Sequence, residues 1–326
     1  MRDNFGRVVD YLRLSVTDRC NLRCRYCMPA QGVDSLGHGQ ILSYEELLRV
    51  ASAAAAIGVR KIRVTGGEPL VRKGLVEFIG RLAALPQRPE ITLTTNGMLL
   101  AQYAAPLKQA GLSRVNVSLD TLRSERFAQL TRRSGFEQVL AGLTAAEQVG
   151  LAPLKINMVP IAGVNADEVA DFARLTLEHP WEIRFIEFMP VSGDLDFPPE
   201  SRFPADDIIA AFSSVAPVKV IPRQGSGGVA RLFRFAGAPG RLGVIPAVSH
   251  HFCHECNRLR VTADGRVRPC LFSDDELDLR TLLRSGVGDE ELHRFLRHAI
   301  SAKPEKHHIG EEDFRPGARP MQGIGG

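Results

Sequence analysis

The amino-acid sequence predicts an α/β fold, an open partial (β/α)6 barrel of the TIM type followed by a C-terminal α+β domain. Six strand-like segments alternate with helical segments as far as Pro190, a pattern that favours a parallel sheet with right-handed crossovers. Gly, Pro, Asn, Ser and Asp gather at the carboxyl ends of these strands, where barrel folds carry their chemistry. Six strands are too few to close an eight-stranded barrel, and a doubly wound open sheet is the alternative.

The predicted strands are short runs of apolar and β-branched residues that end in turn-forming residues. They cover residues 11–17, 61–65, 91–95, 114–119, 154–159 and 183–188. A capping box, Ser43-x-x-Glu46, opens an Ala- and Leu-rich helix that runs to about Gly58. A second helix is expected over residues 72–84.

The composition changes after Pro190, where residues 196–200 (Asp-Phe-Pro-Pro-Glu) have the character of a linker. We therefore expect two domains, a partial barrel over residues 1–195 and a smaller domain over residues 196–326. The smaller domain is predicted to contain a helix over 204–213, short strands around 217–222, 230–236 and 242–246, a flexible loop over 223–228 and two C-terminal helices.

The overall composition is that of an ordinary globular enzyme, with 24% charged and 44% hydrophobic residues among 326. The net charge of +4 suits a small anionic substrate and is too weak to indicate nucleic-acid binding. The sequence has no apolar run of about 18 residues, and its start lacks the apolar core of a secretion signal. No membrane association is predicted, and the cytoplasm is the expected location.

Three of the six cysteines, Cys20, Cys24 and Cys27, stand at a C-x3-C-x2-C spacing. They can converge on one soft-metal centre, since Cys24 and Cys27 are at most ~10 Å apart even in an extended chain. Three thiolates leave one coordination position open for a reactant. The alternatives are a pair of buried thiols or a structural zinc site, whose fourth ligand would have to come from beyond the Gly-containing loop that precedes His38.

The other three cysteines, Cys253, Cys256 and Cys270, form a second triad. Asp264-Gly265 predicts a two-residue hairpin turn that pairs 263 with 266, 261 with 268 and 259 with 270. This turn would return Cys270 to the neighbourhood of Cys256, and the strand alternation would place Arg258 and Arg260 on one face beside the triad. A zinc knuckle that uses His250, His251 or His254 as its fourth ligand is the alternative.

The first triad, with aromatic Tyr26 before its last cysteine, resembles the signature of radical S-adenosylmethionine (SAM) enzymes. In that superfamily the three cysteines hold a [4Fe–4S] cluster whose fourth iron binds SAM. The wider sequence resembles the GTP 3′,8-cyclases of molybdenum-cofactor biosynthesis (the MoaA type) from about residue 5 to the last residue. The segments that carry this resemblance are 17–21 (TDRCN), 63–69 (RVTGGEP), 94–97 (TTNG), 118–120 (SLD), 252–260 (FCHECNRLR) and 319–326 (RPMQGIGG).

The resemblance implies a role for each of these motifs and an open partial-barrel fold. The SAM contacts it implies are Tyr26, Gly67, Ser118 and Met189, and the GTP contacts are Arg13, Arg63, Thr94, Lys155, Arg258 and Arg260. Catalytic roles are implied for Arg13, Arg258, Arg260 and a C-terminal tail that ends in Gly325 and Gly326. The two triads would each hold one [4Fe–4S] cluster. The residues alone allow another interpretation of Arg13, Arg63 and Lys155, as exposed edge charges or internal ion pairs.

The activity that the resemblance implies is the conversion of GTP to 3′,8-cyclo-7,8-dihydro-GTP through a 5′-deoxyadenosyl radical, a lyase reaction that begins molybdenum-cofactor biosynthesis. The implied partners are an electron donor such as flavodoxin or ferredoxin and, as the next pathway enzyme, cyclic pyranopterin monophosphate synthase. The sequence leaves both a monomer and a homodimer open. Two competing hypotheses are another radical SAM enzyme, for instance a peptide modifier with an auxiliary cluster, and a non-catalytic zinc- or iron-binding sensor.

Overall fold

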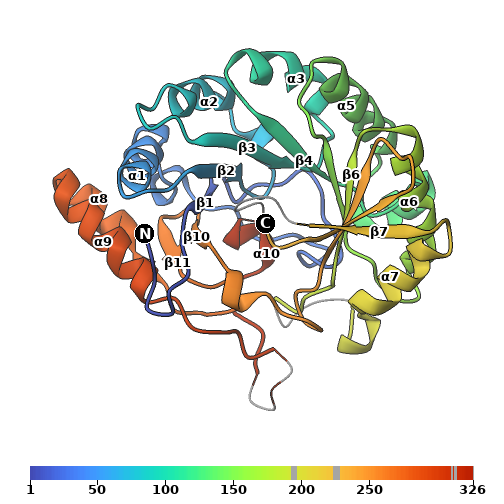
Figure 1. The fold of residues 1–326 in the computed structure, drawn as a ribbon. Coiled ribbons are helices and arrows are strands. Elements are labelled where there is room, and N and C mark those ends of the chain that lie inside the picture. Colours follow the sequence, from blue (N-terminus) through green and yellow to red (C-terminus); the bar gives the residue numbers. More distant parts are fainter. Residues whose placement is uncertain (192–196, 223–227, 310, 312–313, 326) are drawn as a thin grey trace.

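A computed structural model describes residues 1–191, 197–222, 228–309, 311 and 314–325, and Figure 1 shows the fold. Six parallel strands form the centre of one sheet, in chain order from β1 to β6. They are β1 (Tyr11–Ser15), β2 (Lys61–Thr65), β3 (Glu90–Thr95), β4 (Arg114–Ser118), β5 (Lys155–Met158) and β6 (Glu182–Ile186). The six predicted strands are therefore confirmed, with ends that differ by at most two residues.

The C-terminal part of the chain extends this sheet at both edges. Strand β10 (Arg258–Val261) pairs in parallel with β1, and β9 (Arg241–Ile245) pairs in parallel with β6. Antiparallel strands lie outside them, in the sheet order β12-β11-β10-β1-β2-β3-β4-β5-β6-β9-β8-β7. These outer strands are β11 (Arg266–Arg268), β12 (Leu277–Asp278), β8 (Arg231–Phe235) and β7 (Val218–Ile221).

The sheet is open, because β12 and β7 end it without pairing to each other in the described chain. The predicted fold class, an open partial barrel with an appended α+β part, is confirmed. The domain boundary between residues 195 and 196 stays a prediction, although the strands on its two sides belong to one continuous sheet.

Helices α1 to α6 cover the outer face of the parallel strands (Figure 1). They are α1 (Tyr44–Ala56), α2 (Leu75–Ala83), α3 (Leu100–Gln109), α4 (Ser124–Thr131), α5 (Phe136–Gln148) and α6 (Val169–Glu178). The predicted capping box forms at α1, where the Ser43 hydroxyl accepts from the Glu46 N–H and the Glu46 carboxylate accepts from the Ser43 N–H. The predicted second helix begins three residues late, because a 3-10 turn over Pro69–Val71 and Gly74 in a left-handed conformation precede it.

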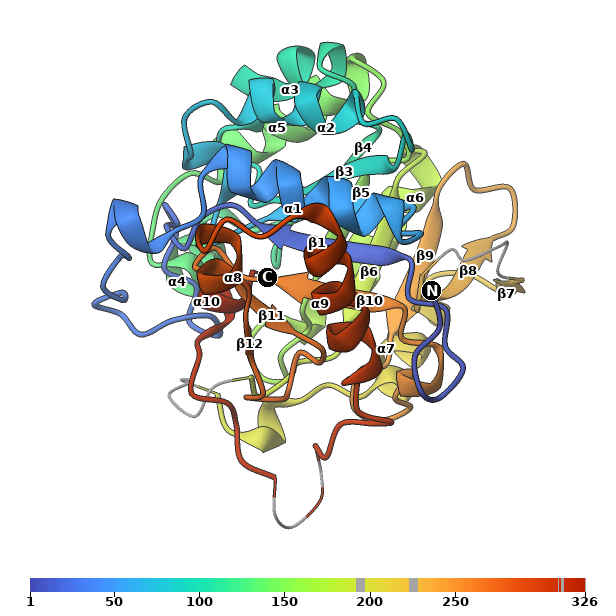
Figure 2. The same ribbon diagram turned by 90° about the vertical axis from the view of Figure 1, so that its left-hand side faces the viewer.

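The remaining helices are α7 (Ala205–Ser213), α8 (Leu279–Arg284), α9 (Asp289–Ser301) and the short α10 (Met321–Ile324). Figure 2 shows α8, α9 and α10 on the side of the molecule that carries β10 and β11. Further 3-10 turns cover His38–Gln40, Ala166–Glu168, Pro199–Ser201 and Cys253–Glu255. No helix in the described part of the chain is both long and apolar enough to cross a membrane.

The strands separate an apolar layer from a polar one. Leu12 and Leu14 of β1 and Ile62 and Val64 of β2 are fully buried in a single large core against the helices. The residues between them alternate to the other face, and on these two strands they are Arg13 and Arg63. The inner face of the barrel therefore carries charge.

The predicted register of the C-terminal hairpin is wrong by one residue. Val261 pairs with Val267, not with Arg268, and Arg260 pairs with Arg268. The loop has three residues, 263–265, because the Thr262 hydroxyl accepts from the Arg266 N–H and donates to the Asp264 carboxylate. Gly265 closes the loop at φ +77°, and a Cβ there would lie 2.8 Å from Cβ of Arg280.

Candidate active site

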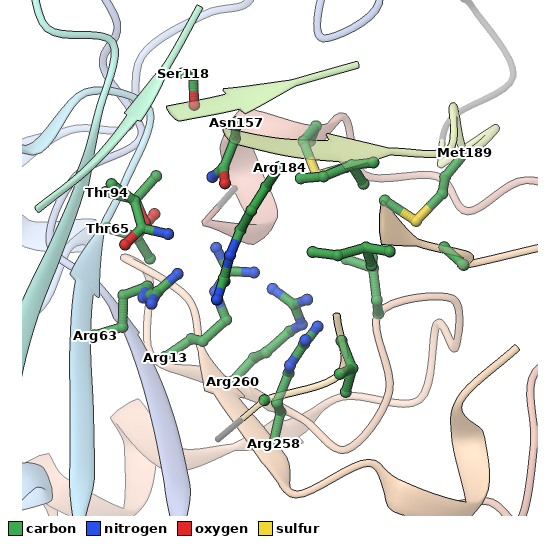
Figure 3. A pocket seen from close by; sticks show the side chains of 18 of the residues that line it. Arg13, Arg63, Thr65, Thr94, Ser118, Asn157, Arg184, Met189, Arg258 and Arg260 are labelled. Carbon is green, nitrogen blue, oxygen red and sulfur yellow. The ribbon is translucent and has the colours of Figure 1, made fainter. Parts of the chain in front are cut away.

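A cavity of about 630 Å³ lies inside the barrel, within the usual size range of small-molecule sites (Figure 3). Its walls come from the inner faces of β1 to β6 and β10 and from both cysteine-containing loops. All six cysteines line it, and none of them forms a disulfide. The two triads, more than 200 residues apart in sequence, thus share one chamber.

The triads lie at opposite ends of the strands. Cys20 follows β1, whereas Cys256 precedes β10, which pairs in parallel with β1 in the register Tyr11↔Arg258. The prediction of chemistry at the carboxyl ends therefore describes the first triad but not the second. The second triad reaches the amino ends because β10 joins the sheet edge, which no local pattern indicated.

The first triad is held by a tight turn in which the N–H groups of Cys27 and Met28 both donate to the Cys24 carbonyl. Burial raises the pKa of Cys20 to about 11 and that of Cys27 to about 12. Thiolates at these positions need a compensating positive centre. Three soft sulfur donors fit an iron–sulfur cluster.

The described residues include no ready-made site for a single metal ion. A zinc ion draws its sulfur ligands to about 2.3 Å, and no three His, Cys, Asp or Glu side chains in the described residues converge that closely on a point. A cluster of several irons spreads its ligands further apart than one ion does. The donor chemistry of both triads suits the larger centre.

Gly66 and Gly67 allow the loop after β2 to pack against the backbone of the first cysteine loop. A Cβ on Gly67 would lie 2.5 Å from the Arg19 carbonyl oxygen, and one on Gly66 would lie 2.7 Å from that of Thr17. The Gly67 N–H donates to the Thr17 carbonyl. Glu68 then accepts from Thr95 and Asn96, which ties β2 to β3. The predicted contact of Gly67 with SAM stays a prediction.

A cationic wall lies between the triads. Arg13 of β1 is the register partner of both Arg260 of β10 and Arg63 of β2, so three arginines stand in a row across three strands. Figure 3 shows them pointing into the cavity together with Arg258 and Arg184. Burial, together with the neighbouring Arg258, lowers the pKa of Arg260 to about 10.

Several donors of this wall are buried without a hydrogen-bond partner in the described chain. They include Nε of Arg13, Nε of Arg258 and Nη1 of Arg260. Burial and the neighbouring Arg260 lower the pKa of Arg13 well below its ordinary value. Buried donors and uncompensated cations are costly. This wall is therefore built to receive an anionic ligand.

Sequence reasoning missed three polar residues of the opposite wall. Both side-chain polar atoms of Asn116 on β4 are buried without a hydrogen-bond partner in the described structure. Oδ1 of Asn157 on β5 is buried and unpaired in the same way. Arg184 on β6 lines the cavity and contacts Glu182. Their signal was a polar residue between apolar neighbours, which is informative only once the strand register is known.

Lys155, a predicted GTP contact, does not line the cavity. It is buried, and its Nζ lies 2.8 Å from Oε1 of Glu182. Burial would raise the pKa of Glu182, but Arg184 and Lys155 hold it at about 2. The contact of Lys155 with GTP stays a prediction.

The C-terminal tail enters the same region. Met321 and Gln322 of α10 line the cavity, and the Gly325 carbonyl accepts from the Thr65 hydroxyl at 3.2 Å. A Cβ on Gly325 would lie 2.7 Å from Cβ of Ser15, and its φ is +89°. Gly326 lies outside the described residues.

The structure brings together most of the predicted site residues. Those that line the cavity are Arg13, Cys20, Cys24, Tyr26, Cys27, Arg63, Gly67, Thr94, Ser118, Met189, Cys253, Cys256, Arg258, Arg260 and Cys270. Lys155 and Gly325 do not line the cavity. Lys155 donates to Glu182, and the Gly325 carbonyl accepts from Thr65.

An open parallel sheet whose first strand leads into a three-cysteine loop defines a radical SAM protein. The sequence model of the Radical SAM superfamily matches residues 14–176, and that of Molybdenum Cofactor Synthesis C matches residues 181–309. Among solved structures, the crystal structure of Streptococcus suis SuiB bound to S-adenosylmethionine has a similar fold. Its TM-score is 0.61 at 15% identity, over 89% of this chain and 68% of that one.

Curated relatives match along the whole chain. The GTP 3′,8-cyclase of Geobacter sulfurreducens is 49% identical over 99% of both chains, and that of Moorella thermoacetica is 48% identical over 100% of both. The GTP 3′,8-cyclase of Pelotomaculum thermopropionicum is 47% identical, again over 100% of both chains. The chain therefore belongs to the GTP 3′,8-cyclase family of the radical SAM superfamily.

Proposed function

We propose that this protein is a GTP 3′,8-cyclase that converts GTP to 3′,8-cyclo-7,8-dihydro-GTP, the first step of molybdenum-cofactor biosynthesis. Membership of the family supports this activity along the whole chain. The observation that carries the proposal is one cavity in which two three-cysteine loops flank a row of arginines. Two members of that row, Arg13 and Arg260, have buried N–H groups without a hydrogen-bond partner in the described chain. Such a cavity suits one anionic nucleotide between two clusters.

The cofactors are SAM and two [4Fe–4S] clusters. Cys20, Cys24 and Cys27 hold the first cluster, which together with SAM supplies a 5′-deoxyadenosyl radical when bound. We assign the SAM contacts to Tyr26, Gly67, Ser118 and Met189, all in the cavity wall. Tyr26 is fixed for this role, because its hydroxyl donates to Asp120 at 2.7 Å.

The chain's own contribution to the substrate is charge and placement. Arg13, Arg258 and Arg260 have buried N–H groups that await acceptors, and guanidinium forks match phosphate oxygens. We assign them, with Arg63 and Thr94, to the GTP triphosphate and ribose. Lys155 is proposed as a further GTP contact, in concert with Arg184, since both are bonded to Glu182.

Cys253, Cys256 and Cys270 hold the second cluster. Three protein ligands leave one position of that cluster for a further ligand, and we assign it to the guanine base. The Gly325–Gly326 tail is proposed to complete the site at the other end, beside the carboxyl ends of β1 and β2. Binding in this cavity would limit contact of a substrate radical with water and would hold the reacting atoms together.

Partners and location belong to the same proposal. An electron donor such as flavodoxin or ferredoxin would reduce the first cluster. Cyclic pyranopterin monophosphate synthase would receive the product, and the enzyme would work in the cytoplasm as a monomer or a homodimer.

Anaerobic incubation with SAM, a reductant and GTP tests the proposal. The expected result is 5′-deoxyadenosine formed only when GTP is present, together with the cyclised nucleotide. Iron and acid-labile sulfide should each reach about eight per chain, as two four-iron clusters require. Formation of 5′-deoxyadenosine that depends on a peptide and not on GTP would assign the chain to the peptide modifiers. Stoichiometric zinc with little iron would reject both.

A further inference from the structure

A buried lysine touches the second cysteine triad from behind. Lys303 follows α9 and is 3% exposed. Its Nζ lies 3.7 Å from Sγ of Cys256 and 2.7 Å from each of two backbone carbonyl oxygens, those of Arg258 and Pro269. These carbonyls belong to the two arms of the hairpin that carries Cys270, so the ammonium sits between two ligands of the triad.

The chain fixes Lys303 on both sides. The Lys303 N–H donates to the Ile300 carbonyl at the end of α9. Beyond it, the buried guanidinium of Arg7 donates to the carbonyls of Pro304 and Glu305, and also to that of Cys253. Segment 303–305 is therefore clamped against the triad by the N-terminal part of the chain.

The three acceptors around Nζ use all three N–H groups of an ammonium, one more than a neutral amine could donate. A buried positive charge thus lies against the sulfur of Cys256. By contrast, Cys20 of the first triad accepts from neutral donors, the backbone N–H of Leu22 and the Asn96 amide.

A donor to a ligand sulfur and a nearby cation both stabilise the more electron-rich, reduced state of an iron–sulfur cluster. We propose that Lys303 is a positioning residue of the second cluster, which fixes Cys256 and raises the reduction potential of that cluster alone. This inference rests on the second cluster of the proposed function. On this inference, the two clusters in the cavity have different reduction potentials, and the side chain of Lys303 causes part of the difference.

Anaerobic redox titration, followed by electron paramagnetic resonance of both clusters, tests this role. The variants are Lys303→Met, which removes charge and donors, and Lys303→Gln, which keeps a neutral donor. Lys306→Met is the matched control, because that lysine is half exposed and pairs with Glu311. We expect the reduction equilibrium of the second cluster to shift at least tenfold in Lys303→Met, which is about 59 mV for one electron. The first cluster should keep its potential in every variant.

The outcomes separate this inference from the proposed function. A wild-type protein with only one cluster would overturn both. Two clusters whose potentials are unchanged in Lys303→Met and Lys303→Gln would overturn the inference and leave the function standing. Loss of the second cluster from both variants would also overturn it, because a purely structural lysine would have that effect. A lowered potential in either loaded variant, with the control unchanged, supports it.

Discussion

Replacing Arg319 with methionine should release the C-terminal tail from the active site. Arg319 immediately precedes the segment that leads to α10, and its guanidinium bonds two carboxylates. It lies 2.8 Å from Oδ2 of Asp264, at the tip of the β10–β11 hairpin, and 2.7 Å from Oε1 of Glu276. This side chain is the ion-pair anchor that the structure shows between the tail and the hairpin that carries Cys270.

The size of the effect follows from the partners that remain. Asp264 keeps the Thr262 hydroxyl and Glu276 keeps Arg268, so neither carboxylate is left alone. The side chain of Arg319 is 27% exposed, which weakens its ion pairs through solvent screening. Charged hydrogen bonds of this kind contribute about 1.5–3 kcal/mol. If the free energy that holds the tail in place falls by about 2 kcal/mol, the tail opens roughly 30-fold more often.

Hydrogen exchange measures that opening directly. The Gly323 and Gly325 N–H groups donate to Pro320 and Met321, and both should exchange roughly 30-fold faster in Arg319→Met. Strand β2 should keep its protection, and cyclisation should fall in parallel with tail opening while both clusters stay loaded. Arg315→Met is the control, since Arg315 is exposed on the same segment. Tail amides that exchange at the wild-type rate in Arg319→Met would refute the anchoring role.

Three further predictions concern the cavity and its supports. Arg13→Met should weaken GTP binding at least tenfold. It should nevertheless raise the Tm of the ligand-free protein by about 2–4 °C, because it removes a half-buried cation that neighbouring arginines disfavour; a lowered Tm would contradict this. Deletion of Gly325 and Gly326 should cut cyclisation severely and leave the iron content unchanged, whereas full activity would remove the tail from the mechanism. Burial raises the pKa of Glu68 from 4.5 to about 7, so its protonated form favours the folded state. The free energy of unfolding of the wild type, measured with denaturant, should therefore fall by up to about 3 kcal/mol as the pH rises from 4.5 through 7. The Glu68→Gln variant should not show this fall.

The sequence could predict what local patterns determine. Apolar alternation placed the six central strands, and the Ser43–Glu46 box placed the start of α1, because both depend on residues close in sequence. The hairpin register failed by one residue because a side-chain bond from Thr262 selected a three-residue loop over the two-residue turn that Asp264-Gly265 favours.

The candidate site was predictable in its residues but not in its layout. Cysteine spacing and family resemblance named both triads, but pairing of β10 with β1 spans more than 240 positions, and no local rule specifies it. Asn116 and Asn157 were not predicted as site residues for the same reason. A polar residue in a strand is ambiguous until its neighbours across the sheet are known, and here those neighbours include Thr94 and Ser118.

The placement of the triads at opposite ends of β1 and β10 constrains the substrate. Ser15 lies four residues beyond Tyr11, which amounts to about 13 Å along the strand. The paired Arg13 and Arg260 lie midway. One ligand that meets the chemistry at both ends must lie along the strands, with its anionic part held against this arginine pair. On the proposed assignment, two clusters would reach one nucleotide without approaching each other, which would account for a cavity with two cysteine loops and a cationic wall between them.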